Sequence, residues 1–441
     1  MTKTRIDALL LPLFGGVLFV GVGVFLGHSS PAGQADFLQV YADSRCIAHH
    51  HDPYLPSEFV AFYQADIGNL PPDSDPADHS LREIIVLARN LPSTLFVIAP
   101  IAALPWKWAA VLWMAIISGT FILASFTTWN IGAGSAPGLS GLLVCLLLAN
   151  SELLLSSGNT AALVVSLTVI ATCCLLREHS IPVAILCFAI ALAVKPQDAG
   201  PIWLFFFLAG GVHRKRAIQI AAITAAIALP AVLWVSHSAP HWWPELQSNL
   251  AVGRLKGDLN NPGPTSLGAR GFGMFVTLQP LFALIRDDSR SYDLCTYAVC
   301  AAPLILWLVK TLRSRFSARS AWFALASISA LSMLPVYHRT NDAKLLLFAI
   351  PACALLWREQ SALRWIALSL NAAAFLLTGD LFWAVVWHFT RFSPASLNAA
   401  VIIAPLILLA TGVFYLCIYL RRDASDHEPG RAQSAALLTT A

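Results

Sequence analysis

The sequence predicts an all-α, polytopic membrane protein, and two features carry this prediction. Of 441 residues, 57% are hydrophobic and only 12% are charged, whereas a soluble domain carries about 25% charged residues. The apolar residues also form long runs, and about 20 of them in a row can cross a bilayer as a helix. Such runs must be helical, because the bilayer interior offers no water to satisfy backbone groups. The net charge is only +4, and no nucleic-acid partner is expected.

The first predicted element is an apolar helix over about 6–26, after the short N-terminus MTKTR. A cleavable signal peptide has an apolar core of about 7–15 residues, and this run is longer, so we predict an uncleaved first span. Together with it, the remaining apolar runs give about 12 transmembrane helices. These runs are roughly 91–104, 105–129, 160–176, 181–195, 199–212, 217–236, 292–312, 319–335, 343–357, 361–379 and 398–420.

Lysine and arginine set the predicted orientation, because they favour the cytoplasmic side of a membrane. The segment 28–90 holds nine acids against three lysines and arginines, so we predict a long first periplasmic loop there and a later one over 237–270. Both termini are then cytoplasmic. The basic groups predicted to face the cytoplasm are His213–Arg216, Lys310, Arg313, Arg315, Arg319, Arg358, Arg364, Arg421 and Arg422.

Two apolar segments do not fit this crossing count. The run 138–155 would reverse the orientation of everything after it, so we predict a broken or re-entrant helix that ends at the SSGN turn, 156–159. The short run 271–286 is expected to lie along the membrane interface. Residues 1–422 are thus predicted to form a single transmembrane domain, followed by a disordered cytoplasmic tail over 423–441.

The outer segments place ionisable groups within a few residues of predicted helix ends. They are the carboxylate of Asp36, the lysine Lys195, and the pair His338–Arg339 with Asp342 behind it. Ionisable groups near a membrane are costly unless they pair, reach water or serve a function. A carboxylate can accept a proton from an attacking hydroxyl, and cations can hold an anionic leaving group such as a lipid phosphate. This inventory therefore indicates group transfer at the outer membrane surface.

Short motifs in a particular order run through nearly the whole chain. They are Asp36–Phe37 with Val40–Tyr41, then Asp52–Pro53–Tyr54, Asn90–Leu91–Pro92, Leu104–Pro105, Gly158–Asn159, Lys195–Pro196–Gln197, and Tyr337–His338 leading to Asp342. In these motifs the chain resembles the glycosyltransferase family 87 proteins, which are polyprenyl-phosphate-dependent mannosyl- and arabinosyltransferases of the GT-C superfamily. Two departures concern acceptor recognition: Ser157–Gly158–Asn159–Thr160 stands where many members have Gly-Gln-x-Asn, and His51 stands where glycine is common.

The resemblance implies a GT-C-like fold and an inverting glycosyltransferase. The enzyme would move a mannose- or arabinofuranose-type sugar from a polyprenyl-phosphate donor to a glycolipid or polysaccharide acceptor, on the periplasmic face of the bacterial inner membrane. It implies Asp36 as general base, with Lys195 and His338 near the donor phosphate, and we expect Arg339 beside them. No cofactor is expected, and nothing in the sequence demands a metal. Substrate contacts are expected from Tyr41, Asp52, Tyr54, Asn159, Gln197 and Asp342.

Several of these residues have structural alternatives. Asp36 could simply cap a short interfacial helix, and Lys195 could be an anchor whose ammonium snorkels to the surface. His338 and Arg339 could contact lipid headgroups. Asp43 lies two helical turns after Asp36 and is expected to be solvated. The consecutive histidines 49–51 point in different directions on a helix or a strand, so a metal site is not expected there.

Two other classes of membrane protein share part of this pattern. A lipid-linked sugar flippase or secondary transporter would also have about 12 spans, but it should carry ionisable residues in mid-helix and internal symmetry. An O-antigen ligase or another lipid-dependent surface-polymer enzyme would use the same membrane side with a different acceptor. Polar groups at outer helix ends and a long first outer loop favour an enzyme.

Overall fold

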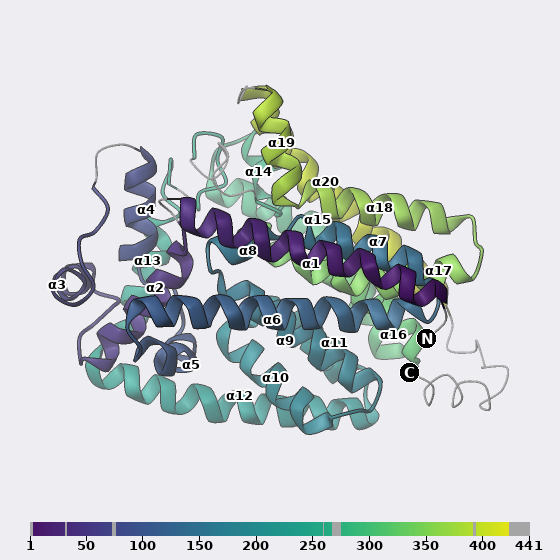
Figure 1. Cartoon of the computed structure of the whole chain (residues 1–441), viewed down its shortest axis with the longest axis horizontal. Coiled ribbons are helices and arrows are strands. Elements are labelled where there is room, and N and C mark those ends of the chain that lie inside the picture. Colours follow the sequence, from purple (N-terminus) through teal and green to yellow (C-terminus); the bar gives the residue numbers. More distant parts are fainter. Residues whose placement is uncertain are drawn as a thin grey trace.

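The computed structural model describes residues 3–30, 33–72, 76–258, 260–266, 275–390 and 394–422, and the predicted tail 423–441 lies outside these ranges. Within them the chain is helical, and the one β-type pairing is an isolated antiparallel bridge between Phe275 and Arg339. The all-α class is therefore confirmed (Figure 1). The helices are α1 (Lys3–Ser29), α2 (Ala35–Ala48), α3 (Pro56–Asp66), α4 (Pro76–Val86), α5 (Pro92–Ala102), α6 (Trp106–Ala133), α7 (Pro137–Leu148), α8 (Glu152–Ser156), α9 (Thr160–Leu176), α10 (Ile181–Val194), α11 (Pro196–Leu208), α12 (Gly211–Ser238), α13 (Trp242–Val252), α14 (Gln279–Ala283), α15 (Ser289–Arg313), α16 (Ala318–Leu331), the 3-10 helix η2 (Asp342–Phe348), α17 (Ala349–Arg358), α18 (Leu363–Leu377), α19 (Asp380–Thr390) and α20 (Pro394–Arg421).

Five of the described helices are long and apolar enough to cross a membrane, and a bent pair could make a sixth span. The pair is α18 with α19, which bend by 70° at their junction. Three other predicted spans, 91–104, 160–176 and 181–195, contain shorter apolar helices of 11 to 17 residues. The protein is therefore a membrane protein by its helices, and length and composition alone do not bring the count to 12. The long helices are Arg5–Ser29, Trp106–Ala133, Gly211–Ser238, Ser289–Arg313 and Val401–Arg421.

The segment 138–155 runs beside α1 in the same direction. A Cβ built on Gly15 would lie 2.8 Å from Cα of Cys145, and one built on Gly23 would lie 2.9 Å from Cβ of Leu155. Contacts that advance together in both sequences identify a parallel pair, and Figure 1 shows α7 and α8 following α1 toward its end. The predicted break exists between α7 and α8, but the segment does not turn back on itself.

The segment 91–104 does not form the predicted span. Its helix α5 has only 11 residues, about 16 Å at 1.5 Å per residue, against a hydrocarbon core of about 30 Å. It packs along α2, where Ser44 Oγ donates to the Leu95 carbonyl at 3.2 Å and Tyr41 Oη to the Leu104 carbonyl at 2.9 Å. Proline at both boundaries stops this helix early. As a single straight helix, α5 is therefore too short to cross the hydrocarbon core.

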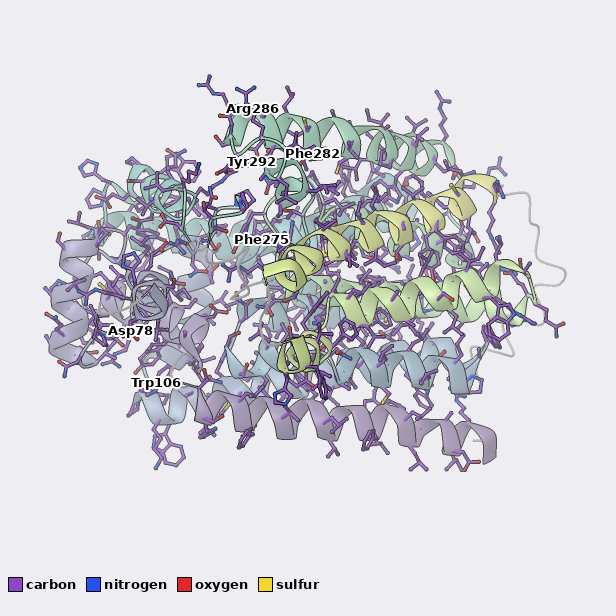
Figure 2. All side chains as sticks on the ribbon, turned by 90° about the horizontal axis from the view of Figure 1, so that it is seen from above. Asp78, Trp106, Phe275, Phe282, Arg286 and Tyr292 are labelled. Atoms are coloured by element: carbon purple, nitrogen blue, oxygen red, sulfur yellow. The ribbon has the colours of Figure 1, made fainter. Side chains whose placement is uncertain are left out.

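The predicted cytoplasmic cations gather at one end of the helical bundle. Glu359 at the end of α17 joins Arg319 at the start of α16 and Arg422 after α20, each with a 2.5 Å contact. Arg5 at the start of α1 donates to the Asn130 side chain near the end of α6. Figure 1 places α2, α4 and α13 at the opposite end, and Figure 2 shows Trp106, the first residue of α6, at that end with Asp78 of α4. The helix ends predicted to be outer therefore lie opposite the basic end.

A pair of adjacent glycines tests the packing of α1 against α7. At Gly15 a Cβ would lie 2.8 Å and 2.9 Å from backbone atoms of Cys145, whereas a Cβ at Gly16 meets nothing within 4 Å. We expect Gly15→Ala to destabilise the protein by about 1–3 kcal/mol through overpacking. Gly16→Ala should be neutral or stabilising, by up to about 1 kcal/mol, because alanine favours helices. Thermal unfolding in detergent measures both, and equal midpoints would contradict the close approach.

Candidate functional site

The start of α2 is fixed to the end of α8 through its backbone. Gln34 precedes α2 in a left-handed conformation with φ 63°, and its N–H donates to the Ser156 carbonyl at 2.7 Å. The next link is the Asp36 N–H, which donates to the Ser157 carbonyl at 3.1 Å. Asp36 lies in the first turn of α2, but its side chain does not cap that helix. The N-capping alternative is therefore wrong, and the half-buried carboxylate is available for other contacts.

Asn159 holds the Asp36 carboxylate. Its Nδ2 donates to Asp36 Oδ2 at 2.7 Å, and its Oδ1 accepts the Ala161 N–H at 2.8 Å as the N-cap of α9. Because the cap uses the carbonyl oxygen of the amide, the NH2 group must face Asp36. One carboxylate oxygen of Asp36 is thus tied to α9 through Asn159.

A second polar group surrounds Lys195, which connects α10 to α11. Pro196 ends the helical hydrogen bonding at this point, and the Lys195 backbone is extended, with φ −149° and ψ 81°. Its Nζ lies 3.0 Å from Asp198 Oδ2 and also contacts Asp342 Oδ1. His338 Nε2 lies 3.3 Å from Asp198 Oδ1. We call Lys195, Asp198, His338 and Asp342 the lysine cluster. Its members other than Lys195 are almost fully buried.

The turn before η2 orients the other half of the lysine cluster. His338 Nδ1 contacts the Val336 carbonyl at 3.0 Å, which directs Nε2 toward Asp198. The Arg339 N–H donates to Asp342 Oδ2 at 2.9 Å, which leaves Oδ1 for Lys195. Burial alone would lower the pKa of His338, but Asp198 and Asp342 raise it above its usual value. Two carboxylates thus face an ammonium and an imidazole whose protonated form they favour, and the charges of the lysine cluster balance when His338 is protonated.

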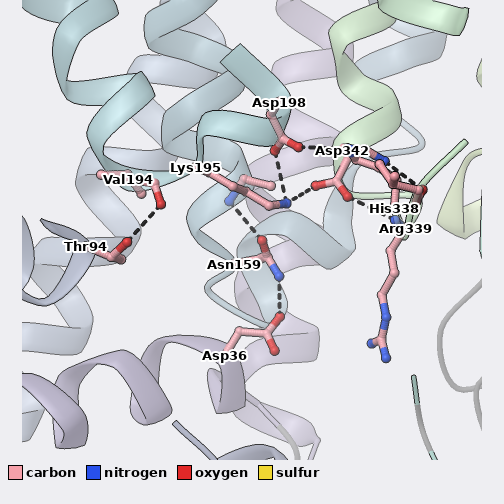
Figure 3. A network of polar contacts seen from close by, with 11 residues as sticks. Asp36, Thr94, Asn159, Val194, Lys195, Asp198, His338, Arg339 and Asp342 are labelled. Carbon is pink, nitrogen blue, oxygen red and sulfur yellow. Dashed lines mark hydrogen bonds and ion pairs between the residues drawn. The ribbon is translucent and has the colours of Figure 1, made fainter. Parts of the chain in front are cut away.

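Arg339 extends away from the lysine cluster toward the outer loops (Figure 3). Its guanidinium donates to Asn260 Oδ1 at 2.6 Å and lies 5.6 Å from the centre of the Tyr337 ring. The Tyr337 hydroxyl donates to the same Asn260 oxygen at 2.7 Å. The second large outer loop is thereby held against the turn that carries His338 and Arg339.

Three members of the lysine cluster could also act as metal ligands. Asp198, His338 and Asp342 offer ligand atoms that all lie within 4.8 Å of one another, and two carboxylates with an imidazole suit a divalent transition metal. The Lys195 ammonium already contacts both carboxylates. A metal would therefore have to displace a cation that balances the same charges.

The structure does not bring all predicted substrate residues to this site. Tyr41 donates to the backbone near α5, as described above, and Asp52 Oδ1 accepts the Tyr54 N–H at 2.8 Å in a tight turn. The fully buried Tyr54 donates its hydroxyl to the Asn90 carbonyl at 2.8 Å. Gln197 is exposed on the first turn of α11. The hydrogen bonds of Tyr41, Asp52 and Tyr54 thus hold outer turns together instead of entering the lysine cluster.

Tyr41 also lines an open cavity of about 440 Å³ at the turn between α5 and α6. Trp106 forms part of its wall, and so do Arg45 and Asp66, whose side chains meet at 2.7 Å and 2.9 Å. An aromatic wall beside a planar ion pair is suited to a polar ring such as a sugar. Asp43, on the same helix, was expected to be solvated, and this is wrong: it is fully buried, and burial raises its pKa well above the usual value.

Glu245 on α13 provides a prediction for pH dependence. Burial, followed by a hydrogen bond and repulsion from Asp52, raises the pKa of Glu245 to about 7. A raised pKa of a carboxyl means that the folded state binds the proton more tightly than the unfolded state. This contribution to stability is complete below the unfolded pKa and is lost as pH rises through about 7. We expect the melting temperature to fall from about pH 5 to 8, and Glu245→Gln to flatten this fall; an unchanged slope would contradict the assignment.

Asp198 is a site residue that the sequence analysis missed. A signal was present, because Asp198 follows Lys195 by three positions at a helix start, and residues at this spacing share a helix face.

Five of the predicted site residues do gather at one end of the bundle (Figure 3): Asp36, Asn159, Lys195, His338 and Asp342. Compared with protein-family models, with curated proteins and with solved structures, the chain gives no match.

Proposed function

We propose that the protein is a membrane glycosyltransferase that moves a sugar from a polyprenyl-phosphate donor to the hydroxyl of a glycolipid or polysaccharide acceptor. One observation carries the proposal: the half-buried Asp36 carboxylate, fixed by Asn159, lies at the same end of the bundle as the lysine cluster (Figure 3). A general base and a group of cations are what this transfer needs, the base for the acceptor and the cations for the leaving phosphate.

The reaction is a single displacement with inversion. The acceptor oxygen attacks the anomeric carbon and forms the new glycosidic bond, while the bond from that carbon to the phosphate oxygen breaks. The acceptor proton passes to Asp36. Because Asn159 holds Oδ2, Oδ1 is the oxygen that accepts this proton. The polyprenyl phosphate leaves with both electrons of the broken bond.

The charges of the lysine cluster favour Arg339 as the direct phosphate ligand. Lys195 and His338 already face Asp198 and Asp342, so a phosphate would add its charge to a neutral group. Arg339 reaches outward and can bind a phosphate with two parallel N–H donors. We expect Lys195 and His338 to stabilise the phosphate electrostatically, without contacting it directly.

The proposed topology has about 12 traverses with both ends of the chain in the cytoplasm. It counts the α7–α8 pair and leaves out α5, and the basic end faces the cytoplasm because lysine and arginine favour that side. The site then faces the periplasm of a bacterial inner membrane. In this arrangement the cavity beside Tyr41 and Trp106 would receive the acceptor sugar.

Transfer in a reconstituted membrane tests the proposal. The purified protein in lipid nanodiscs is incubated with a panel of polyprenyl-phosphate mannose and arabinose donors and with glycolipid acceptors, and products are identified by mass spectrometry. We expect one donor and acceptor pair to give a new glycolipid and free polyprenyl phosphate. Absence of transfer across the panel by a folded, donor-binding protein would argue against the proposal.

A lipid-linked sugar flippase is a second candidate, because one observation favours it. Ionisable residues inside the bundle are typical of transporters, and Glu152 and Lys344 are each 2% exposed beside broken helices. Proteoliposomes distinguish the two functions: a flippase moves a labelled polyprenyl-phosphate sugar between leaflets and leaves its glycosidic bond intact.

A further inference from the structure

Two helix breaks contact each other inside the bundle, next to the candidate site. One separates α7 from α8, and the other separates α18 from α19. A Cβ built on Gly379 would lie only 2.4 Å from Cβ of Asn150 and 2.7 Å from its Oδ1. Glycine at 379 therefore allows the two breaks to touch.

Each break caps the helix that begins at the other. Asp380 Oδ2 accepts the Leu153 N–H at 3.0 Å at the start of α8. Asn150 Oδ1 accepts the Phe382 N–H at 3.1 Å at the start of α19. Backbone groups freed by the breaks are thus satisfied by side chains from the opposite break, as a non-aqueous interior requires.

Lys344 donates hydrogen bonds to backbone carbonyls at both breaks. It is 2% exposed, and its Nζ donates to the Asn150 carbonyl at 2.5 Å and to the Thr378 carbonyl at 3.2 Å. These carbonyls belong to the C-terminal ends of α7 and α18, and each helix C-terminus carries about half a negative charge. The two helix ends together balance the single charge of Lys344.

Glu152, the first residue of α8, is left without a balancing partner. It is 2% exposed, and among the described residues no side chain donates a hydrogen bond to either carboxylate oxygen; only the backbone N–H groups of Ser151 and of Glu152 itself lie close to the carboxylate. The charged groups that face it are Asp380 of α19 and Lys344 of η2. The helices α1, α6 and α9 also pack against α8, and none of the largest electrostatic effects on Glu152 comes from them. An ionised Glu152 would add an uncompensated charge to an interior that already holds Asp380.

We propose that Glu152 is a proton-binding site, occupied at neutral pH and emptied as an ionised carboxylate when its proton is lost to water. A proton satisfies the geometry better than a metal ion does, because one O–H removes the excess charge. A sodium ion would need several oxygen ligands, and the two nearby carbonyls are already taken by Lys344.

The proton site is linked to the candidate site at both ends. Glu152 begins α8, whose following residue Ser157 accepts the Asp36 N–H. Lys344 lies two residues after Asp342, which pairs with Lys195. Loss of the proton would draw Glu152 toward Lys344, so we expect proton occupancy to affect the position of Asp36. The proposal does not rest on the proposed function, because it concerns a proton and no sugar substrate.

Infrared difference spectroscopy tests the proposal on the full chain in nanodiscs. The experiments use a background with Glu245→Gln and Asp43→Asn, because the pKa of Glu245 is about 7 and burial holds the pKa of Asp43 well above its usual value. We expect a carbonyl stretching band of a protonated carboxylic acid at neutral pH, and Glu152→Gln should remove it. The matched control Glu359→Gln should keep the band, because Glu359 is paired with Arg319 and Arg422.

Three outcomes would overturn the proposal. The band could be absent at neutral pH, it could survive Glu152→Gln, or it could disappear at constant pH when sodium replaces choline, which would identify a sodium site instead. If Glu152→Gln does not fold, the background protein is grown with glutamate labelled with carbon-13 at the side-chain carboxyl. We then expect the band to shift to lower frequency; an unshifted band would assign it to an aspartic acid.

Discussion

Replacing Asp36 by asparagine is expected to slow sugar transfer by about 10²- to 10⁴-fold, the usual contribution of a general base. Asparagine keeps the size of the side chain, and its carbonyl can still accept the hydrogen bond from Asn159 Nδ2. It cannot take up the acceptor proton. We therefore expect the loss in kcat, with donor binding close to wild type. Initial rates in nanodiscs and a donor-binding titration measure the two quantities separately.

Two further variants control this experiment. Asn159→Ala removes the contact that holds Asp36 Oδ2 and the cap of α9, and we expect a smaller loss of rate than for Asp36→Asn. Asp287→Asn changes a carboxylate that pairs with the exposed Lys256 at 2.9 Å, and it should transfer sugar at the wild-type rate. Transfer by Asp36→Asn at the wild-type rate would remove Asp36 as the base.

Lys195→Met is expected to destabilise the protein by about 3–5 kcal/mol, the cost of removing one partner from a buried ion pair. The change leaves Asp198 and Asp342 buried close to each other, with only His338 to balance them. Methionine preserves the volume of the chain, so the loss reports charge and not a cavity. Thermal or denaturant unfolding in detergent measures it.

A surface lysine and a rescue variant sharpen this prediction. Lys256 pairs with Asp287 but its side chain is 69% exposed, so Lys256→Met should cost only about 0–1 kcal/mol. Adding Asp198→Asn to Lys195→Met removes one of the two stranded carboxylates, and we expect part of the stability to return. If the double variant is no more stable than Lys195→Met, the ion pairs are not what Lys195 contributes.

The sequence predicted the end of the bundle at which the site would form, for a simple physical reason. Asp36, Lys195 and His338 each follow or begin a break in an apolar run, and charged groups at such breaks collect at the same membrane surface. The pairing among them was not predictable. Whether Lys195 faces a phosphate or Asp342 depends on a contact across 147 positions, and no local pattern encodes that distance.

Helix length was the other point at which the sequence was insufficient. Hydropathy favoured crossing for 91–104, and the orientation set by lysine and arginine then favoured a broken or re-entrant path for 138–155. The outcome depended on packing: α5 lies along α2, and the glycines of α1 let α7 and α8 run parallel to it. The burial of Glu152 and Lys344 could not be predicted for the same reason, because two breaks far apart in sequence have to meet before these side chains acquire their surroundings.

The neutrality of the lysine cluster has a consequence for turnover. A site built from free cations would hold a leaving phosphate tightly and release its lipid product slowly. Here Lys195 and His338 are already paired with Asp198 and Asp342, so in the proposed reaction Arg339 alone would contact the phosphate directly. If the proposed transfer takes place, the two acids would therefore weaken the attraction between the site and the departing phosphate, and release of the lipid product would be faster than from a site of unpaired cations.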